Sequence, residues 1–350
     1  MEIKLGVPEM DLTSKGDTWD ACWADDGNLY LSSDDSYGFN DQPTRNLHVH
    51  VLRGSTPERL RGETINLMDE YGKMSERGPD GCMWKANGLT CVDGILYLFV
   101  SRHEADAFVN PQKRDDSKLQ TAGNSSLIMS TDKGRTWRRT ARENYERPMF
   151  PGRRFGSPFF VKYGQDGQGG AHGGDRYIYA VANNGFWENG DDMILARVLR
   201  ERLARLDAAD WQFYRGGDGL DNGSWTANAD RSAPILVNPG KCGMTGVQYI
   251  EHLERYFMIQ WYYTGGSGHL APEETEWIFY AAQTPWGPWH DIGHHRFPGV
   301  GYYNPCIAGK FISSDGKRFE IFTNGNFKTH DKSGFDCLYR LTRIPGAVVI

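Results

Sequence analysis

Five residues of this 350-residue sequence have the chemistry and the surroundings to transfer a proton. Asp17 opens one apolar run, Asp34 and Asp35 follow the next, and His103 and Glu104 end a third. Acid–base catalysis of hydrolysis typically needs two carboxyl groups, one protonated and one ionised. We expect Asp17 to be the base or nucleophile, with Asp34 or Asp35 as its partner. His103 and Glu104 are the other candidates for proton transfer, since histidine titrates near neutral pH.

Each of these residues also has a structural interpretation. Asp17 stands beside Gly16, where an aspartate often caps a turn. Asp34 and Asp35 could be solvated loop acids, and His103 could be a core histidine with satisfied hydrogen bonds. The sequence leaves both interpretations open.

A second set of residues could bind a polyhydroxylated ligand. Flat apolar faces of sugar rings stack on Trp and Tyr side chains, and sugar hydroxyl groups pair with amides and carboxylates. We expect the following residues to contact such a substrate: Trp19, Asp20, Asn87, Arg102, Arg154, Trp187, Gln248, Tyr263, Tyr303 and Asn304.

Bringing these residues to one place requires a scaffold, and the sequence repeats one layout five times. Each unit has an apolar run, a turn and a second apolar run; Asp93-Gly94 is the strongest hairpin signal among the turns. The units open near residues 17, 86, 157, 245 and 304. Four antiparallel strands repeated radially describe a β-propeller. We therefore predict an all-β fold, a single five-bladed β-propeller over residues 1–350 with four antiparallel strands per blade.

The last unit has too few strands of its own. Cys337–Ile344 offers a third strand, and the N-terminal Glu2–Val7 could supply the fourth and close the ring. A double-layer β-sandwich is the alternative, because strand number alone does not distinguish the two folds. The only clear helical pattern is short, at Arg200–Leu206.

The long polar loops are expected on one face of the propeller. In a four-stranded blade, the loop after the second strand returns to the face where the innermost strand begins. Long loops on a rigid scaffold usually carry the site. These loops are Ser32–Asn46, Ser101–Ser125, Asn183–Asp192, Tyr263–Thr275 and Asn324–Phe335.

Three short motifs resemble known families. Ser130–Trp137 matches S-x-D-x-G-x-T-W, the Asp-box hairpin of sialidases and many other propellers, and Gln283–Trp289 resembles a P-x-G-P-W hairpin of five-bladed glycoside hydrolases. The block from Gly16 to Phe39 resembles the start of the family called domain of unknown function 4185, with further similarity at Phe155–Pro158 and Leu195–Val198. Members of that family have been assigned to glycoside hydrolases, including arabinan-cleaving ones. The resemblance implies a five-bladed propeller acting on carbohydrate, with a carboxylate at a position like that of Asp17.

Composition excludes several partners. The net charge is −6 and there is no basic block, so we expect no nucleic-acid or membrane partner. The N-terminal residues show no signal peptide, so the protein is cytoplasmic as written, or secreted or periplasmic with its signal removed. Neither a metal-binding HExxH motif nor a nucleotide-binding loop occurs. We expect no cofactor, although an axial calcium or other ion is an alternative.

Three functions compete. The first is a glycoside hydrolase acting on a poly- or oligosaccharide through carboxyl groups. The second is a polysaccharide lyase, in which Arg102 and Arg154 would neutralise a uronate and His103 or a tyrosine would abstract the proton α to it. The third is a non-catalytic sugar-binding propeller. The sequence determines neither the sugar and linkage nor the oligomeric state.

Overall fold

A computed structural model describes residues 1–104, 120–171, 176–264, 274–326 and 335–349. Most of them belong to antiparallel strands that pair in chain order, in five runs that we call strand groups. Group 1 contains β3 (Ser14–Trp23), β4 (Leu29–Phe39), β5 (Arg45–Arg53) and β6 (Arg61–Asn66). Group 2 contains β7 (Met83–Val92), β8 (Ile95–Glu104) and β9 (Thr121–Ser130). Group 3 contains β10 (Phe159–Lys162), β11 (Tyr177–Asn183), β12 (Gly190–Leu199), β13 (Trp211–Tyr214), β14 (Trp225–Thr226) and β15 (Leu236–Cys242).

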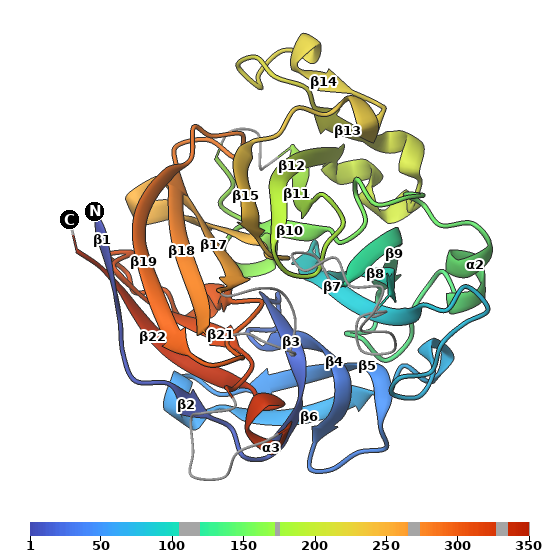
Figure 1. Cartoon of the computed structure of the whole chain (residues 1–350), viewed down its shortest axis with the longest axis vertical. Coiled ribbons are helices and arrows are strands. Elements are labelled where there is room, and N and C mark those ends of the chain that lie inside the picture. Colours follow the sequence, from blue (N-terminus) through green and yellow to red (C-terminus); the bar gives the residue numbers. More distant parts are fainter. Residues whose placement is uncertain (105–119, 172–175, 265–273, 327–334, 350) are drawn as a thin grey trace.

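The other two groups complete the molecule. Group 4 contains β16 (Val247–Ile250), β17 (Arg255–Tyr263), β18 (Glu274–Ala282) and β19 (His290–Pro298). Group 5 contains β20 (Cys306–Ile307), β21 (Arg318–Thr323), β22 (Thr342–Val349), β1 (Glu2–Leu5) and β2 (Glu9–Met10). A parallel pairing of β10 with β16 joins groups 3 and 4 into one sheet. The sheets are arranged around a common centre, as the blades of a β-propeller are (Figure 1).

Helices are few and short, which confirms the all-β prediction. The α-helices of the described residues are α2 (Ala141–Glu146) and α3 (Phe335–Leu338). The pattern at Arg200–Leu206 forms a 3-10 helix, η5 (Arg200–Arg205). Further 3-10 turns are Pro57–Arg59, Asp69–Tyr71 (η2), Gln165–Gly167, Ala208–Asp210, Asn222–Ser224, Ala229–Arg231, Glu251–Leu253 and Gly309–Phe311. No helix among the described residues is long and apolar enough to cross a bilayer.

The core lies between neighbouring strand groups, where the flat faces of the sheets pack on each other. Phe99 of β8 contacts Phe160 of β10 with ring centroids 4.8 Å apart, and Trp211 of β13 packs 5.8 Å from Phe99. These aromatic residues therefore fill the space between strand groups 2 and 3.

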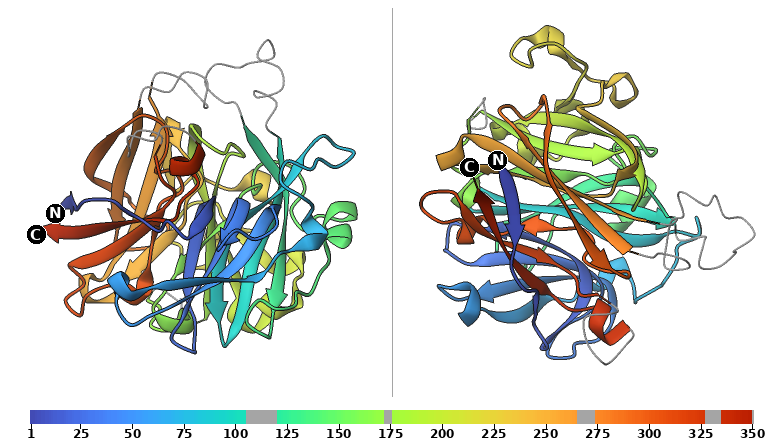
Figure 2. Two further views of the ribbon diagram at one scale, coloured as in Figure 1. Left: turned by 90° about the horizontal axis from the view of Figure 1, so that it is seen from below. Right: turned by 60° about the vertical axis from the view of Figure 1, so that its left-hand side comes forward.

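The two chain ends lie side by side (Figure 2). Strand β1 pairs with β22 in an antiparallel register in which Glu2 faces Val349. The predicted third strand at Cys337–Ile344 was placed too early, because α3 occupies the first part of that segment and β22 begins at Thr342.

Two loops are shorter than expected. Strand β4 continues to Phe39 and pairs with β5, so Asp34 and Asp35 lie on a strand and not in a loop. Strand β8 likewise continues to Glu104. Parts of the expected loops at Ser101–Ser125, Tyr263–Thr275 and Asn324–Phe335 lie outside the described residues.

The turn that resembles an Asp box is held by its own side chains. Asp132 accepts hydrogen bonds from the Thr136 amide at 2.9 Å and the Thr136 hydroxyl at 2.6 Å. Gly134 has a φ of 87°, and the indole of Trp137 donates to its carbonyl oxygen at 3.1 Å. These contacts give the turn a structural role.

Candidate functional site

The site is built from the strands that begin at the centre of the molecule. In the register of β3 and β4, Asp17 lies opposite Asp34, and register shifts interrupt the pairing on both sides of Asp17. Bulges of this kind redirect side chains and are frequent beside active sites. Thr18 and Asp35 have positive φ values of 50° and 39°. This conformation is costly for a β-branched residue and clusters at functional sites.

Asp17 is a buried carboxyl group that favours its protonated form. Only 6% of the residue is exposed. Its Oδ2 accepts a hydrogen bond from the Tyr303 hydroxyl at 2.5 Å, whereas its Oδ1 has no hydrogen-bond partner. Burial raises the pKa of Asp17 well above its usual value, and the charge of Asp35 raises it further. Lys85 and the Tyr303 hydrogen bond oppose this rise without cancelling it.

The neighbouring carboxyl groups differ from Asp17 and from each other. Asp35 forms an ion pair with Lys85, with 2.6 Å between Oδ1 and Nζ. Burial favours the neutral amine, but Asp35, Asp34 and Asp17 together raise the pKa of Lys85, so the ammonium persists. Asp34 accepts a hydrogen bond from the Ala86 amide at 2.8 Å, and burial raises its pKa to about 7. Asp34 thereby links β4 to β7.

Aromatic residues form one wall of the site. Trp187 contacts Tyr303 and Trp261, with ring centroids 4.6 Å and 4.9 Å away, and Tyr263 lies 6.3 Å from it. These rings are buried against each other. Tyr303 is flanked by two residues with positive φ, Tyr302 and Asn304, so the backbone is also strained on this side of Asp17.

Glu188 is a site residue that the sequence analysis missed. It is 0% exposed, and neither of its carboxyl oxygens has a hydrogen-bond partner. Burial raises its pKa to about 8, so it carries a proton at neutral pH. Both Glu188 and Asp17 act electrostatically on Tyr263 and raise its pKa, so both acids belong to the surroundings of that residue. The sequence signals that could have found it were the adjacent Trp187 and its place in the expected site loop Asn183–Asp192.

Group 2 adds two more buried polar side chains. Neither polar atom of Asn87, which is 1% exposed, has a hydrogen-bond partner. The Nε2 of His103 also has none, and burial together with the charge of Lys85 lowers the pKa of His103 to about 3. His103 is therefore neutral. A buried polar atom without a partner is costly unless a ligand or water meets it.

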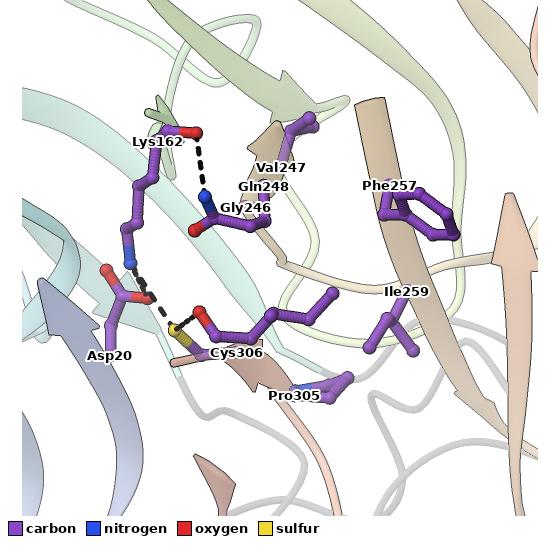
Figure 3. Close-up of a pocket in the computed structure, with 10 residues that line it drawn as sticks. Asp20, Lys162, Gly246, Val247, Gln248, Phe257, Ile259, Pro305 and Cys306 are labelled. Atoms are coloured by element: carbon purple, nitrogen blue, oxygen red, sulfur yellow. Dashed lines mark hydrogen bonds and ion pairs between the residues drawn. The ribbon is translucent and has the colours of Figure 1, made fainter. Parts of the chain in front are cut away.

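Three residues that were expected to contact substrate, Trp19, Asp20 and Gln248, instead contact other residues of the protein. Trp19 is 0% exposed and packs on Phe39 and His50, so its faces are not available to a sugar. Asp20 pairs with Lys162, with 2.5 Å between Oδ1 and Nζ (Figure 3). Gln248 donates to the carbonyl oxygens of Lys162 and Tyr249. These residues belong to the packing at the centre of the molecule.

The expected charged contacts are also paired within the protein. Arg102 binds Asp80 through two nitrogens, at 3.0 Å and 2.8 Å. Arg154 binds Asp192 at 2.7 Å. Glu104 accepts from Thr121 at 3.2 Å and lies 3.7 Å from a guanidinium nitrogen of Arg153. None of these contacts connects them to Asp17.

One group among the described residues has the composition of a metal site. Ligand atoms of Asp25, Cys91 and Asp166 lie within 4.8 Å of one another. The ammonium of Lys133 pairs with Asp25 and donates to the carbonyl oxygen of Gly94 at 2.6 Å. Because a cation of the protein already neutralises this group, we assign no metal to it. The axial ion and the absence of a cofactor stay predictions.

Comparison with solved structures places the fold among known ones. A protein of Bacteroides ovatus ATCC 8483, described only provisionally as a hydrolase, is similar with a TM-score of 0.54 and 14% identity, covering 95% of this chain and 85% of that one. A GH43_1 enzyme from Xanthomonas citri has a TM-score of 0.49 and 13% identity, covering 97% and 89%. The α-L-arabinanase of Cellvibrio cellulosa, complexed with arabinohexaose, has a TM-score of 0.49 and 9% identity, covering 96% and 92%. The likeness to the Bacteroides protein is one of fold.

Comparison with curated proteins finds no significant match. The family model described as domain of unknown function, DUF4185, matches residues 107–316. Since this match spans more than half of the sequence, the protein belongs to the DUF4185 family.

Proposed function

We propose that the protein is a glycoside hydrolase that cleaves a poly- or oligosaccharide at the centre of a five-bladed β-propeller. In this proposal the five strand groups are the blades, and β1 completes the last of them. The observation that carries the proposal is that Asp17, a carboxyl group that favours its protonated form, lies in one cluster with Asp35, a carboxyl group paired with the Lys85 ammonium. Glycoside hydrolysis typically uses such a pair.

The electrostatics favour a role for Asp17 opposite to the one expected from the sequence. Its Oδ2 accepts from Tyr303, which leaves Oδ1 to hold the proton that burial favours. Asp17 would donate this proton to the departing glycosidic oxygen. Asp35, which is paired with Lys85, would activate a water molecule or attack the anomeric carbon. Asp34 would position Asp17 and Asp35, since one of its own carboxyl oxygens already accepts a hydrogen bond from the Ala86 amide of β7.

The unpartnered polar atoms suit a sugar. Asn87, His103 and Glu188 each present at least one buried polar atom without a partner. Sugar hydroxyl groups both donate and accept hydrogen bonds, so they can satisfy amide, imidazole and carboxyl groups together. The wall of Trp187, Tyr263 and Tyr303 would hold this set in place and exclude water.

No observation favours the lyase. The guanidinium groups of Arg102 and Arg154 are already paired with aspartates. His103, with a pKa lowered to about 3, is a weak base. Burial raises the pKa of Tyr303 well above its usual value, which makes its phenolate a poor candidate too.

A screen of plant, algal and bacterial polysaccharides would test the proposal, with reducing ends and ultraviolet absorbance followed together. A hydrolase releases reducing ends alone, and a lyase also produces an unsaturated, absorbing product. We expect Asp17→Asn and Asp35→Asn to abolish release, while Asp41→Asn, at an exposed turn after β4, retains it. Full activity of both Asp17→Asn and Asp35→Asn would refute the proposed mechanism, and absence of any cleavage would favour a binding protein.

A further inference from the structure

A second cavity lies beside the site, between strand groups 1 and 2. Its volume is about 460 Å³, within the range of small-ligand pockets. Its walls come from η2, the segment that follows it up to Pro79, the paired strands β7 and β8, and helix α2. The cavity is not used by the mechanism proposed above.

The β7–β8 strand pair contributes residues to this cavity and to the catalytic cluster. Trp84 of β7 pairs in register with Arg102 of β8, and both line the cavity. The next residue along β7 is Lys85, which holds Asp35, and the next along β8 is His103. Adjacent residues of a strand face opposite sides. The two sites therefore lie on opposite faces of one strand pair, near the same end of it.

The cavity has an ordered aromatic and guanidinium surface. The Arg102 guanidinium lies 4.4 Å from the ring centre of Trp84 and 5.2 Å from that of Tyr145. The guanidinium donates two hydrogen bonds to the Asp80 carboxylate, which hold it in this orientation. Tyr145 is 38% exposed, on a helix whose first turn is fixed by a capping box between Thr140 and Glu143. An exposed ring on a fixed element can stack on the apolar face of a sugar.

The positive charges of the lining are compensated once Asp80 and Glu146, which lie just outside it, are counted, and this favours a neutral ligand. Arg45, Arg102 and Arg142 are each paired with a carboxylate. The remaining charged residues of the lining are two of each sign: Lys73 and Arg77, Glu70 and Glu76. A uronate or phosphate would meet no excess of positive charge, whereas hydroxyl groups can pair with both signs.

We propose that this cavity binds a neutral saccharide unit. This proposal rests on the proposed function in one respect: the saccharide unit in the cavity would belong to a polysaccharide that is also bound at the catalytic cluster. The cavity would then hold a long substrate at a point away from the bond that is cleaved. Short substrates would not reach it.

The test measures binding of the full-length Asp17→Asn protein to immobilised neutral polysaccharides, namely arabinan, xylan, galactan and β-glucan. Polygalacturonate and alginate form the acidic arm. We expect Tyr145→Ala, added to Asp17→Asn, to weaken binding of at least one neutral polymer about fivefold, the size of a lost aromatic stack. Tyr145→Phe should retain binding, and Leu220→Ala, at an exposed apolar residue of strand group 3 outside the cavity lining, should not change it.

The outcomes separate this proposal from the proposed function. Unchanged binding of every neutral polymer by Tyr145→Ala, an effect on acidic polymers alone, or no binding by any variant would each overturn the saccharide cavity. If the wild-type protein releases no reducing ends but Tyr145→Ala still loses binding, the cavity stands and the hydrolase proposal fails. A thermal melt shows whether Tyr145→Ala is folded.

Discussion

The buried ion pair between Asp20 and Lys162 predicts a large and specific loss of stability when one partner is removed. Lys162 donates to Asp20 at 2.5 Å and to the carbonyl oxygen of Ala21 at 2.7 Å, and Asp20 also accepts from the Leu89 amide at 2.6 Å. Three strands, β3, β7 and β10, thus meet at one carboxylate. Replacing Lys162 by methionine keeps an unbranched side chain only one atom shorter and removes the charge.

The magnitude follows from burial. Asp20 and Lys162 have side chains 2% and 9% exposed, so water cannot replace the lost partner. Removing one member of such a pair typically costs about 3–5 kcal/mol, a large part of the total stability of about 5–15 kcal/mol. The double variant Asp20→Asn/Lys162→Met should recover part of this loss, because Asn still accepts from Leu89 and no charge is left buried.

Urea unfolding followed by tryptophan fluorescence measures these differences. Arg142→Met, which breaks the exposed pair with Glu146, is the matched control and should leave the midpoint unchanged. A Lys162→Met midpoint equal to that of the wild type would refute this reasoning. The same variants distinguish the two roles of Asp20, since a substrate contact would raise KM in Asp20→Asn at temperatures well below unfolding.

Three further predictions concern titrating groups. Tyr303→Phe removes a hydrogen bond that favours ionised Asp17, so the pKa of Asp17 should rise. If Asp17 is the acid, the alkaline limb of the pH–rate profile should then move to higher pH. Movement of the acidic limb instead would make Asp17 the base. Burial raises the pKa of Glu188 from 4.5 to about 8, so the wild type should lose stability relative to Glu188→Gln as the pH rises through this interval. Urea unfolding at several pH values measures this difference in stability. A difference that stays constant with pH would contradict the burial of an uncompensated carboxyl group. The pKa of His294 is raised mainly by its hydrogen bond to Glu276, so its contribution is present below pH 6.5 and is lost as the pH rises through the higher folded-state pKa. His294→Gln should therefore lower the melting temperature slightly in acid and leave it unchanged in alkali, since the side chain is 46% exposed.

The strands of the fold could be located from the sequence because hairpin turns and apolar runs are local signals. The Asp93-Gly94 turn joins β7 and β8, as its residues indicate. Asp34 and Asp35 were placed in a loop because their segment is polar. They lie on β4 because pairing with β5, in which Asp34 faces Leu47, extends the strand beyond its apolar part.

The direction of site side chains was harder to predict. Strand alternation assigns faces only while the register is regular, and two shifts around Asp17 interrupt it. As a result, Trp19 and Asp20 were expected to contact substrate and instead lie in the packing. Glu188 carries no local signal of burial, since its position depends on hydrogen bonds from its neighbours to distant segments. The Trp187 amide donates to Gln120 and Asn189 pairs with the backbone of Tyr263.

The pairing of β1 with β22 has a consequence for how the chain is made. The strands that complete group 5 come from opposite ends of the sequence, with Glu2 beside Val349. During synthesis, β1 is made first, and its partner β22 is made only after almost all of the other described residues. A circularly permuted gene that joins Val349 to Glu2 through a short linker, and opens the chain at the exposed bend at Gly217, would make this strand pair a contiguous hairpin. Such a protein should refold faster than the parent, because its last sheet would no longer depend on a contact between distant ends.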